Sequence, residues 1–207
     1  MIPGRWLFIL STLLTYSLPW TAQSGAALTL SAYDLAEWSS LHPVVREGFL
    51  PFAVTFGLRI IPALLLVVFV VDSSSRHWER LIMTALIAIA LLPPVTFFLQ
   101  GLNDANHCQQ MAVSILTLAM SGISITMTPR ALRRALQSVV SVIVIVDSIW
   151  SLATALNLMH RFSHAVQPGA GSVLFILILM IFVAKNRRGN FWQATSQNHA
   201  HSVPNRP

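Results

Sequence analysis

The sequence has few charged residues and a single cysteine. Only 10% of its 207 residues are Asp, Glu, Lys or Arg, whereas 55% are hydrophobic. Soluble domains carry roughly 25% charged residues, so this composition excludes an ordinary soluble globular domain. Because Cys108 is the only cysteine, the chain cannot form an intrachain disulfide, and it has no Cys-x-x-Cys or zinc-ribbon pattern.

Catalytic and nucleotide-binding motifs are also missing. There is no Walker loop, no Gly-x-Ser-x-Gly and no His-Glu-x-x-His. No stretch between the apolar runs is much longer than about 20 residues, which is too short for an extramembrane catalytic domain. We therefore expect a protein that is not an enzyme and holds no cofactor. The net charge of +6 does not indicate nucleic-acid binding, because the basic residues lie beside apolar runs and in the tail.

What the sequence does contain is long apolar runs. We expect each run to cross a hydrocarbon core of roughly 30 Å, and the sixth, which is short, extends backwards through Ala170. The runs are Trp6–Ala22, Phe49–Val71, Leu81–Leu99, Met111–Met127, Ser138–Met159 and Ser172–Ala184. We expect an all-α integral membrane protein with a bundle of about six transmembrane helices. Pro93 and Pro94 remove two backbone donors from the third run and predict a break there.

The first run has two interpretations. Arg5, the apolar core and the small residues Ser24 and Ala26 are typical of a cleaved secretory signal, which would leave five helices. The alternative is a retained first helix within residues 1–26. In both cases residues 27–185 form the bundle and residues 186–207 form a polar tail. We expect the tail to be disordered beyond Trp192.

Lys and Arg set the expected orientation. With six spans, one face holds ten basic residues and the other only Arg46 and Arg161, while Arg59 lies within a run. The ten are Arg5, Arg76, Arg80, Arg130, Arg133, Arg134, Lys185, Arg187, Arg188 and Arg206. The positive-inside rule then predicts a multi-pass protein of the plasma (inner) membrane with both termini cytoplasmic.

The first outer segment predicts a short interfacial helix. Ser31 and Asp34 have the spacing of a helix-capping box. Leu35, Trp38 and Leu41 then recur at three-residue steps on one face. We expect Tyr33 and Trp38 to anchor this helix at the outer membrane surface. Its function is either that of a simple anchor or that of a lid or docking surface, with Tyr33, Asp34 and Trp38 as the docking residues.

Arg59 and Asp147 are the two charged residues deep within apolar runs. A charge at the centre of a membrane helix costs about 2.5 kcal/mol or more. Counting the helical rise from each end of its run places both near the midplane. We therefore predict an intramembrane Arg59–Asp147 ion pair, which acts either as a structural clamp or as a proton- or anion-handling site.

Two further groups of residues are candidate sites. Arg130, Arg133 and Arg134 form one basic face before the fifth run, which predicts contact with anionic lipid head groups. The second group is a conceivable outer metal site, although its spacing matches no specific metal motif. Its members are His107, Cys108, His160 and His164.

These features favour a non-catalytic accessory or structural subunit of a larger membrane complex. The expected partners are the bilayer, anionic lipid head groups, and other membrane subunits or a second copy of the chain. The alternative is a small-solute or ion transporter component that uses Arg59 and Asp147.

Overall fold

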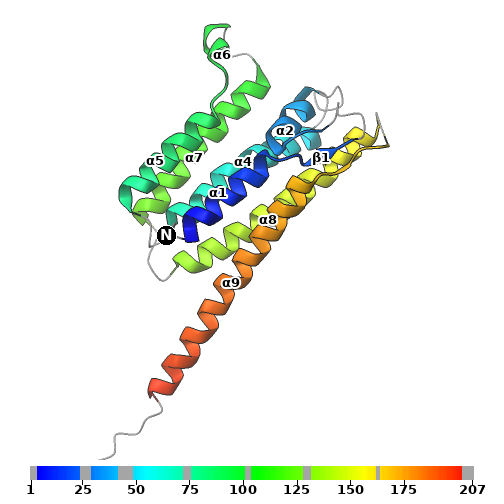
Figure 1. Cartoon of the computed structure of the whole chain (residues 1–207). Coiled ribbons are helices and arrows are strands. Elements are labelled where there is room, and N and C mark those ends of the chain that lie inside the picture. The colour runs from blue at the N-terminus through cyan, green and yellow to red at the C-terminus, as the bar shows by residue number, and fades with distance from the viewer. Residues whose placement is uncertain are drawn as a thin grey trace, which may run out of the picture.

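A computed structural model describes residues 4–23, 29–41, 49–71, 76–100, 104–127, 132–161 and 164–201 (Figure 1). Within these ranges it contains helices and one short pair of strands, which confirms the all-α class. The helices are α1 (Gly4–Ser17), α2 (Ala32–Leu41), α4 (Phe49–Val71), α5 (His77–Ala90), α6 (Val95–Gln100), α7 (Ala105–Met127), α8 (Arg133–His160) and α9 (Ala170–His201). The strands are β1 (Thr21–Ala22) and β2 (Gln167–Pro168).

Six helices lie side by side and alternate in direction. Contacts between side chains, and from side chains to backbone, tie the antiparallel pairs together. Helix α1 contacts α4 through Tyr16 with Leu58 and Trp6 with Phe69, and it contacts α9 through Phe8 with Phe182. Helix α7 contacts α5 through Ser114 with Ala88, and α8 contacts α4 through Gln137 with Val68. The start of α1 and the far end of α9 therefore point toward the same end of the bundle (Figure 1). We call the opposite end, where α2, β1 and α6 lie, the α2 end.

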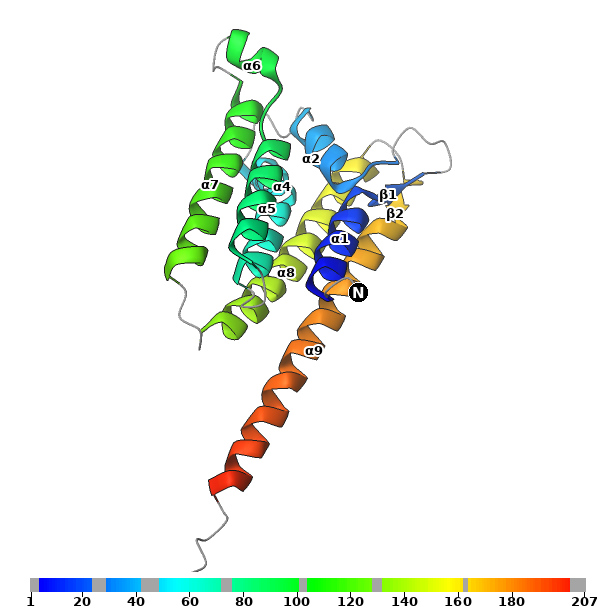
Figure 2. The same ribbon diagram turned by 60° about the vertical axis from the view of Figure 1, so that its left-hand side comes forward.

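Helix α4 is the centre of the bundle (Figure 2). Three helices, α4, α7 and α8, are long and apolar enough to cross a membrane. In the apolar part of α4, 83% of the residues are buried, against 39% for the corresponding parts of α7 and α8. The outer helices thus leave apolar side chains exposed, whereas α4 is surrounded by protein.

The connection after α1 is packed against the start of α9. Trp20 is fully buried and contacts the rings of Tyr16 and Phe175. Strand β1 pairs with β2, and the backbone N–H of Gly171 donates to the carbonyl of Pro19 at 2.8 Å. A Cβ at Gly171 would lie 2.7 Å from that carbonyl oxygen, so only glycine allows the two backbones to approach this closely.

Two segments bear on the sequence predictions. Helix α5 ends at Ala90 and α6 begins at Val95, so the chain does break at Pro93 and Pro94. The tail, by contrast, was expected to be irregular beyond Trp192, yet α9 is helical to His201. No proline precedes Pro204 in this stretch, so nothing interrupts the backbone hydrogen bonds of the helix.

Candidate functional site

Arg59 is the buried centre of a partly exposed polar cluster near the α2 end. Its side chain is only 1% exposed, because α4 is enclosed by other helices. One guanidinium nitrogen, Nη2, lies 2.9 Å from Glu37 Oε2 on α2. The other, Nη1, donates to Gln109 Oε1 at 2.9 Å and to the backbone carbonyl of Asn106 at 3.2 Å, both on α7. Arg59 therefore joins α2, α4 and α7.

Glu37 completes this cluster from α2. Its Oε1 accepts a hydrogen bond from Asn106 Nδ2 at 3.3 Å, and its Oε2 accepts one from Gln110 Nε2 at 3.3 Å. The same Gln110 amide lies 3.4 Å from the Tyr33 hydroxyl. We call these six residues the Arg59 cluster: Tyr33, Glu37, Arg59, Asn106, Gln109 and Gln110. Hydrogen bonds to ionised groups are about twice as strong as neutral ones, so the cluster holds α2 firmly on the bundle.

The cluster also keeps the Tyr33 phenol neutral. Burial raises the pKa of Tyr33, and the nearby Glu37 carboxylate raises this pKa further. The neutral hydroxyl can therefore accept the hydrogen bond from the Gln110 amide.

The predicted Arg59–Asp147 ion pair does not form. Ser151 Oγ donates to Asp147 Oδ1 at 3.4 Å, and the buried Asp147 Oδ2 has no hydrogen-bond partner among the described residues. The reason is the phase of α4. Asp147 lies against Gly57, two residues before Arg59, and two residues turn an α-helix by about 200°. Arg59 therefore points away from α8, toward α2 and α7.

Helix α2 begins with the predicted capping box. The backbone N–H of Asp34 donates to Ser31 Oγ at 3.2 Å, and that of Ser31 donates to Asp34 Oδ2 at 3.3 Å. The interfacial position of α2 stays a prediction, but its apolar face packs inside the protein. Ala32, Leu35 and Ala36 are fully buried and face the bundle, so this apolar face is not available to a lipid surface. The two alanines let α2 approach α4 closely, and Arg59 holds it there.

The three predicted docking residues all have contacts within the chain. Tyr33 belongs to the Arg59 cluster, although its side chain is 37% exposed. Asp34 caps α2, and the half-buried Trp38 packs against the core. The role of α2 as an anchor, a lid or a docking surface therefore stays a prediction.

The basic face before α8 is described only in part. Arg133, in the first turn of α8, is half-buried. Arg130 and the side chain of Arg134 lie outside the described residues. Binding of lipid head groups by these arginines therefore stays a prediction.

The candidate metal ligands lie in two separate places. His107 Nδ1 is 3.3 Å from Asp104 Oδ1, and Cys108 beside it is half-buried. His160 Nε2 is 2.9 Å from the carbonyl of Val166, and its ring centroid is 6.3 Å from that of His164. Among the described residues, no three His, Cys, Asp or Glu side chains are grouped so as to hold a metal ion.

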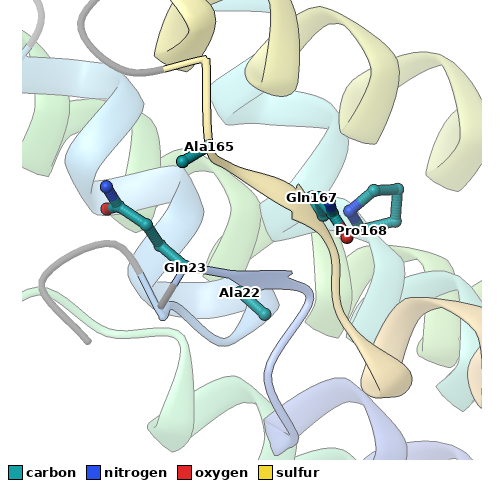
Figure 3. Close-up of a pocket in the computed structure, with 5 residues that line it drawn as sticks. All are labelled: Ala22, Gln23, Ala165, Gln167 and Pro168. Atoms are coloured by element: carbon teal, nitrogen blue, oxygen red, sulfur yellow. The ribbon is translucent and has the colours of Figure 1, made fainter. Parts of the chain in front are cut away.

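An open pocket beside the strand pair is lined by Ala22, Gln23, Ala165, Gln167 and Pro168 (Figure 3). It shares no residue with the Arg59 cluster. Its lining contains no charged or nucleophilic side chain, so we assign no chemistry to it.

The sequence prediction missed Glu37 and the three amides of α7. Helix α7 begins at Ala105, so these amides lie in its first two turns. The signal for them was a set of polar amides spaced i, i+3 and i+4 directly before an apolar run. These are Asn106, Gln109 and Gln110. No protein-family model, curated protein or solved structure matches this chain, so the functional argument rests on the geometry of its own residues.

Proposed function

We propose that this chain is a six-span protein of the plasma (inner) membrane, with both termini cytoplasmic, and that it is a non-catalytic accessory subunit of a larger membrane complex. The observation that carries the proposal is an apolar tip, formed by Val95, Phe98 and Leu99 of α6. The six spans would be α1, α4, α5, α7, α8 and α9.

The outward faces of the helices support membrane insertion. Large apolar side chains such as Leu86 on α5, Ile115 on α7 and Val146 on α8 are 57–61% exposed. Monomeric soluble proteins rarely expose apolar patches of more than a few hundred Å², so lipid is the natural cover for these faces. The alternating directions of the six helices match an even number of passes.

Packing of the first segment supports a retained helix over a cleaved signal. Ile9 and Trp20 are fully buried, and the Tyr16 hydroxyl donates to the Leu58 carbonyl at 2.9 Å. Cleavage near Ala26 would remove these contacts and β1. We expect the intact mass of the membrane-extracted protein to include residues 1–26. A mature N-terminus near Ala27 would reduce the bundle to five spans.

The apolar tip supports the presence of a protein partner. Helix α6 projects beyond α2 and β1 at the α2 end (Figure 2). Val95 and Leu99 are 73% and 80% exposed, and Phe98 is 49% exposed. Phe97 anchors the tip, because its ring centroid lies 5.2 Å from that of His107. A tip beyond the ends of the other helices is poorly placed for cover by lipid, so we assign its cover to the apolar surface of another membrane subunit.

The test is the mass and composition of the native particle in mild detergent. We expect the wild-type chain to be part of a defined hetero-complex, and the double variant Val95→Ala/Leu99→Ala to lose that complex. The matched control is Ile115→Ala, which shortens an exposed apolar side chain on the shaft of α7. Particles that contain only this chain, or a complex that the tip variant leaves intact, would overturn the proposal.

A second candidate function is that of a transporter component, and one observation favours it. Asp147 is a carboxyl group between two helices with one oxygen unpartnered among the described residues. If the chain moves a solute through the bundle, Asp147→Asn should stop flux in reconstituted vesicles. Unchanged flux would remove the basis for this candidate.

A further inference from the structure

Asp147 lies in a tight helix contact that glycine makes possible. A Cβ on Gly57 of α4 would fall 2.5 Å from Asp147 Oδ1 and 2.6 Å from Ser151 Oγ of α8. Any larger residue at position 57 would therefore displace the carboxyl group or separate the helices. Ser151 is fully buried and Asp147 is half-buried, with its Oδ2 atom turned away from the surface.

The carboxyl group has few polar contacts for such a place. Its only hydrogen bond among the described residues is the long one from Ser151, at 3.4 Å, and its Oδ2 is buried without a partner. Arg59, the nearest cation along α4, directs its hydrogen bonds to Glu37, Asn106 and Gln109. An ionised carboxylate in this position would be poorly compensated.

The neighbouring helices supply no charge to pair with it in the part of the chain that the structure describes. On α1, Tyr16 is close enough for electrostatic interaction, but its hydroxyl donates to the Leu58 carbonyl. On α2, Glu37 is paired with Arg59, and Asp34 caps its own helix. On α9, residues 170–184 include no titratable side chain.

We propose that Asp147 is a proton-binding site within the bundle, which holds a proton as a neutral acid in the closed α4–α8 contact and releases it when that contact loosens. A proton removes the uncompensated charge and gives the carboxyl group a donor, with no need for a second ion. Ionisable residues inside membrane helices commonly mark proton relays. This inference goes beyond the accessory-subunit proposal and does not depend on it.

A metal ion does not fit the same place. Divalent cations such as Mg²⁺ take about six oxygen ligands. Among the described residues, the side-chain oxygen within hydrogen-bond distance of Asp147 is that of Ser151, and no three His, Cys, Asp or Glu side chains are grouped so as to hold a metal ion. A proton needs only the unpartnered oxygen.

The first test is the infrared spectrum of the full chain in lipid vesicles. We expect a carboxylic acid C=O band that shifts in D₂O and is absent from Asp147→Asn. The band should weaken as the buffer is changed from mildly acidic to alkaline. A wild-type spectrum with no carboxylic acid band that depends on Asp147 would overturn the proposal.

The second test uses dicyclohexylcarbodiimide, an apolar reagent for protonated carboxyl groups. The acid proton moves to a carbodiimide nitrogen and the carboxylate oxygen adds to the central carbon. The acyl group then migrates from oxygen to nitrogen, so the N-acylurea keeps every atom of both reactants. We expect mass spectrometry to locate the label on Asp147, with less label at alkaline pH.

Glu37 is the internal control for this labelling, because its carboxyl group is paired with Arg59 at 2.9 Å, whereas Asp147 has no such partner among the described residues. A label on Glu37 with none on Asp147 would show that the proton is on the wrong carboxyl group and would contradict the proposal. Gly57→Ala should weaken the carboxylic acid band assigned to Asp147, since the added methyl group loosens the α4–α8 contact in which the proton is held. A band as strong as in the wild type would contradict release of the proton from the loosened contact.

Discussion

Arg59 and Asp147 both lie at the central helix, but on opposite sides of it, and their surroundings differ. Arg59 has a carboxylate at 2.9 Å and two further oxygen acceptors within 3.2 Å, although its own Nε has no hydrogen-bond partner among the described residues. Asp147 has one hydrogen bond of 3.4 Å and an oxygen with none in the same part of the chain. On one side of α4 the Arg59–Glu37 pair of the Arg59 cluster acts as a clamp on α2, and we call this pair the clamp. The other side holds a carboxyl group with a single hydrogen bond among the described residues.

This difference shows that depth along a helix does not identify a partner. Residues two apart in sequence differ little in depth, but they point in nearly opposite directions. Gly57 thus faces α8 while Arg59 faces α2 and α7. The Arg59 cluster fixes α2 on the bundle, and Asp147 is not part of that cluster.

The largest effect is expected from removing the anion of the clamp. Glu37→Ala leaves Arg59 buried without its charge partner, and we expect the free energy of unfolding to fall by about 3 kcal/mol. Titration with a denaturing detergent, followed by circular dichroism, measures this change. Replacing both partners by methionine should recover part of the loss, because no charge then stays buried. A loss in Glu37→Ala of under about 1 kcal/mol would reduce the clamp to an ordinary surface pair.

The next effect comes from filling the contact on the Asp147 side. In Gly57→Ala the new methyl group meets Asp147 and Ser151, and we expect a loss of about 2 kcal/mol. Gly122→Ala on α7 is the matched control, since a Cβ added there would have no other atom within 4 Å and alanine favours helix. Equal effects of the two substitutions would mean that α4 and α8 are not in tight contact at position 57.

A smaller effect is expected at the start of α2. Ser31→Ala removes the hydroxyl that accepts from the Asp34 backbone, and a lost N-cap costs about 1 kcal/mol. Without this cap the first turn of α2 frays, so hydrogen exchange at the backbone amides of α2 should increase more than exchange in α7. Unchanged exchange in α2 would show that the clamp, without the N-cap, is enough to fix this helix.

The smallest effect on stability is expected from Asp147→Asn. The amide has nearly the shape of a protonated carboxyl group, so the change in the free energy of unfolding should stay below about 0.5 kcal/mol. The same detergent titration provides the measurement. A loss comparable with that of Glu37→Ala would mean that Asp147 is ionised and paired.

Much of the fold could be predicted from the sequence. The second apolar run, Phe49–Val71, has the bounds of α4, and the break at Pro93 and Pro94 separates α5 from α6. The capping box at Ser31 located the start of α2. Such features depend on local composition and on backbone hydrogen bonding, which a single sequence reveals directly.

The partner of Arg59 could not be predicted in the same way. It depends on the rotation of α4 about its axis and on the position of α2, and both are decided by packing between helices. The sequence predicts an interfacial helix here, and nothing in its pattern indicates Glu37 as the partner of Arg59. The small residues Ala32 and Ala36 were the signal for close packing against another helix.

The most direct test of the account is a pair of double-mutant cycles that share Arg59→Gln. One cycle combines it with Glu37→Gln and the other with Asp147→Asn, and each measures the coupling free energy between the two side chains. We predict a coupling of about 1.5 kcal/mol or more between Arg59 and Glu37, and one near zero between Arg59 and Asp147. Strong coupling to Asp147 with none to Glu37 would contradict both the clamp and the assignment of a proton to Asp147.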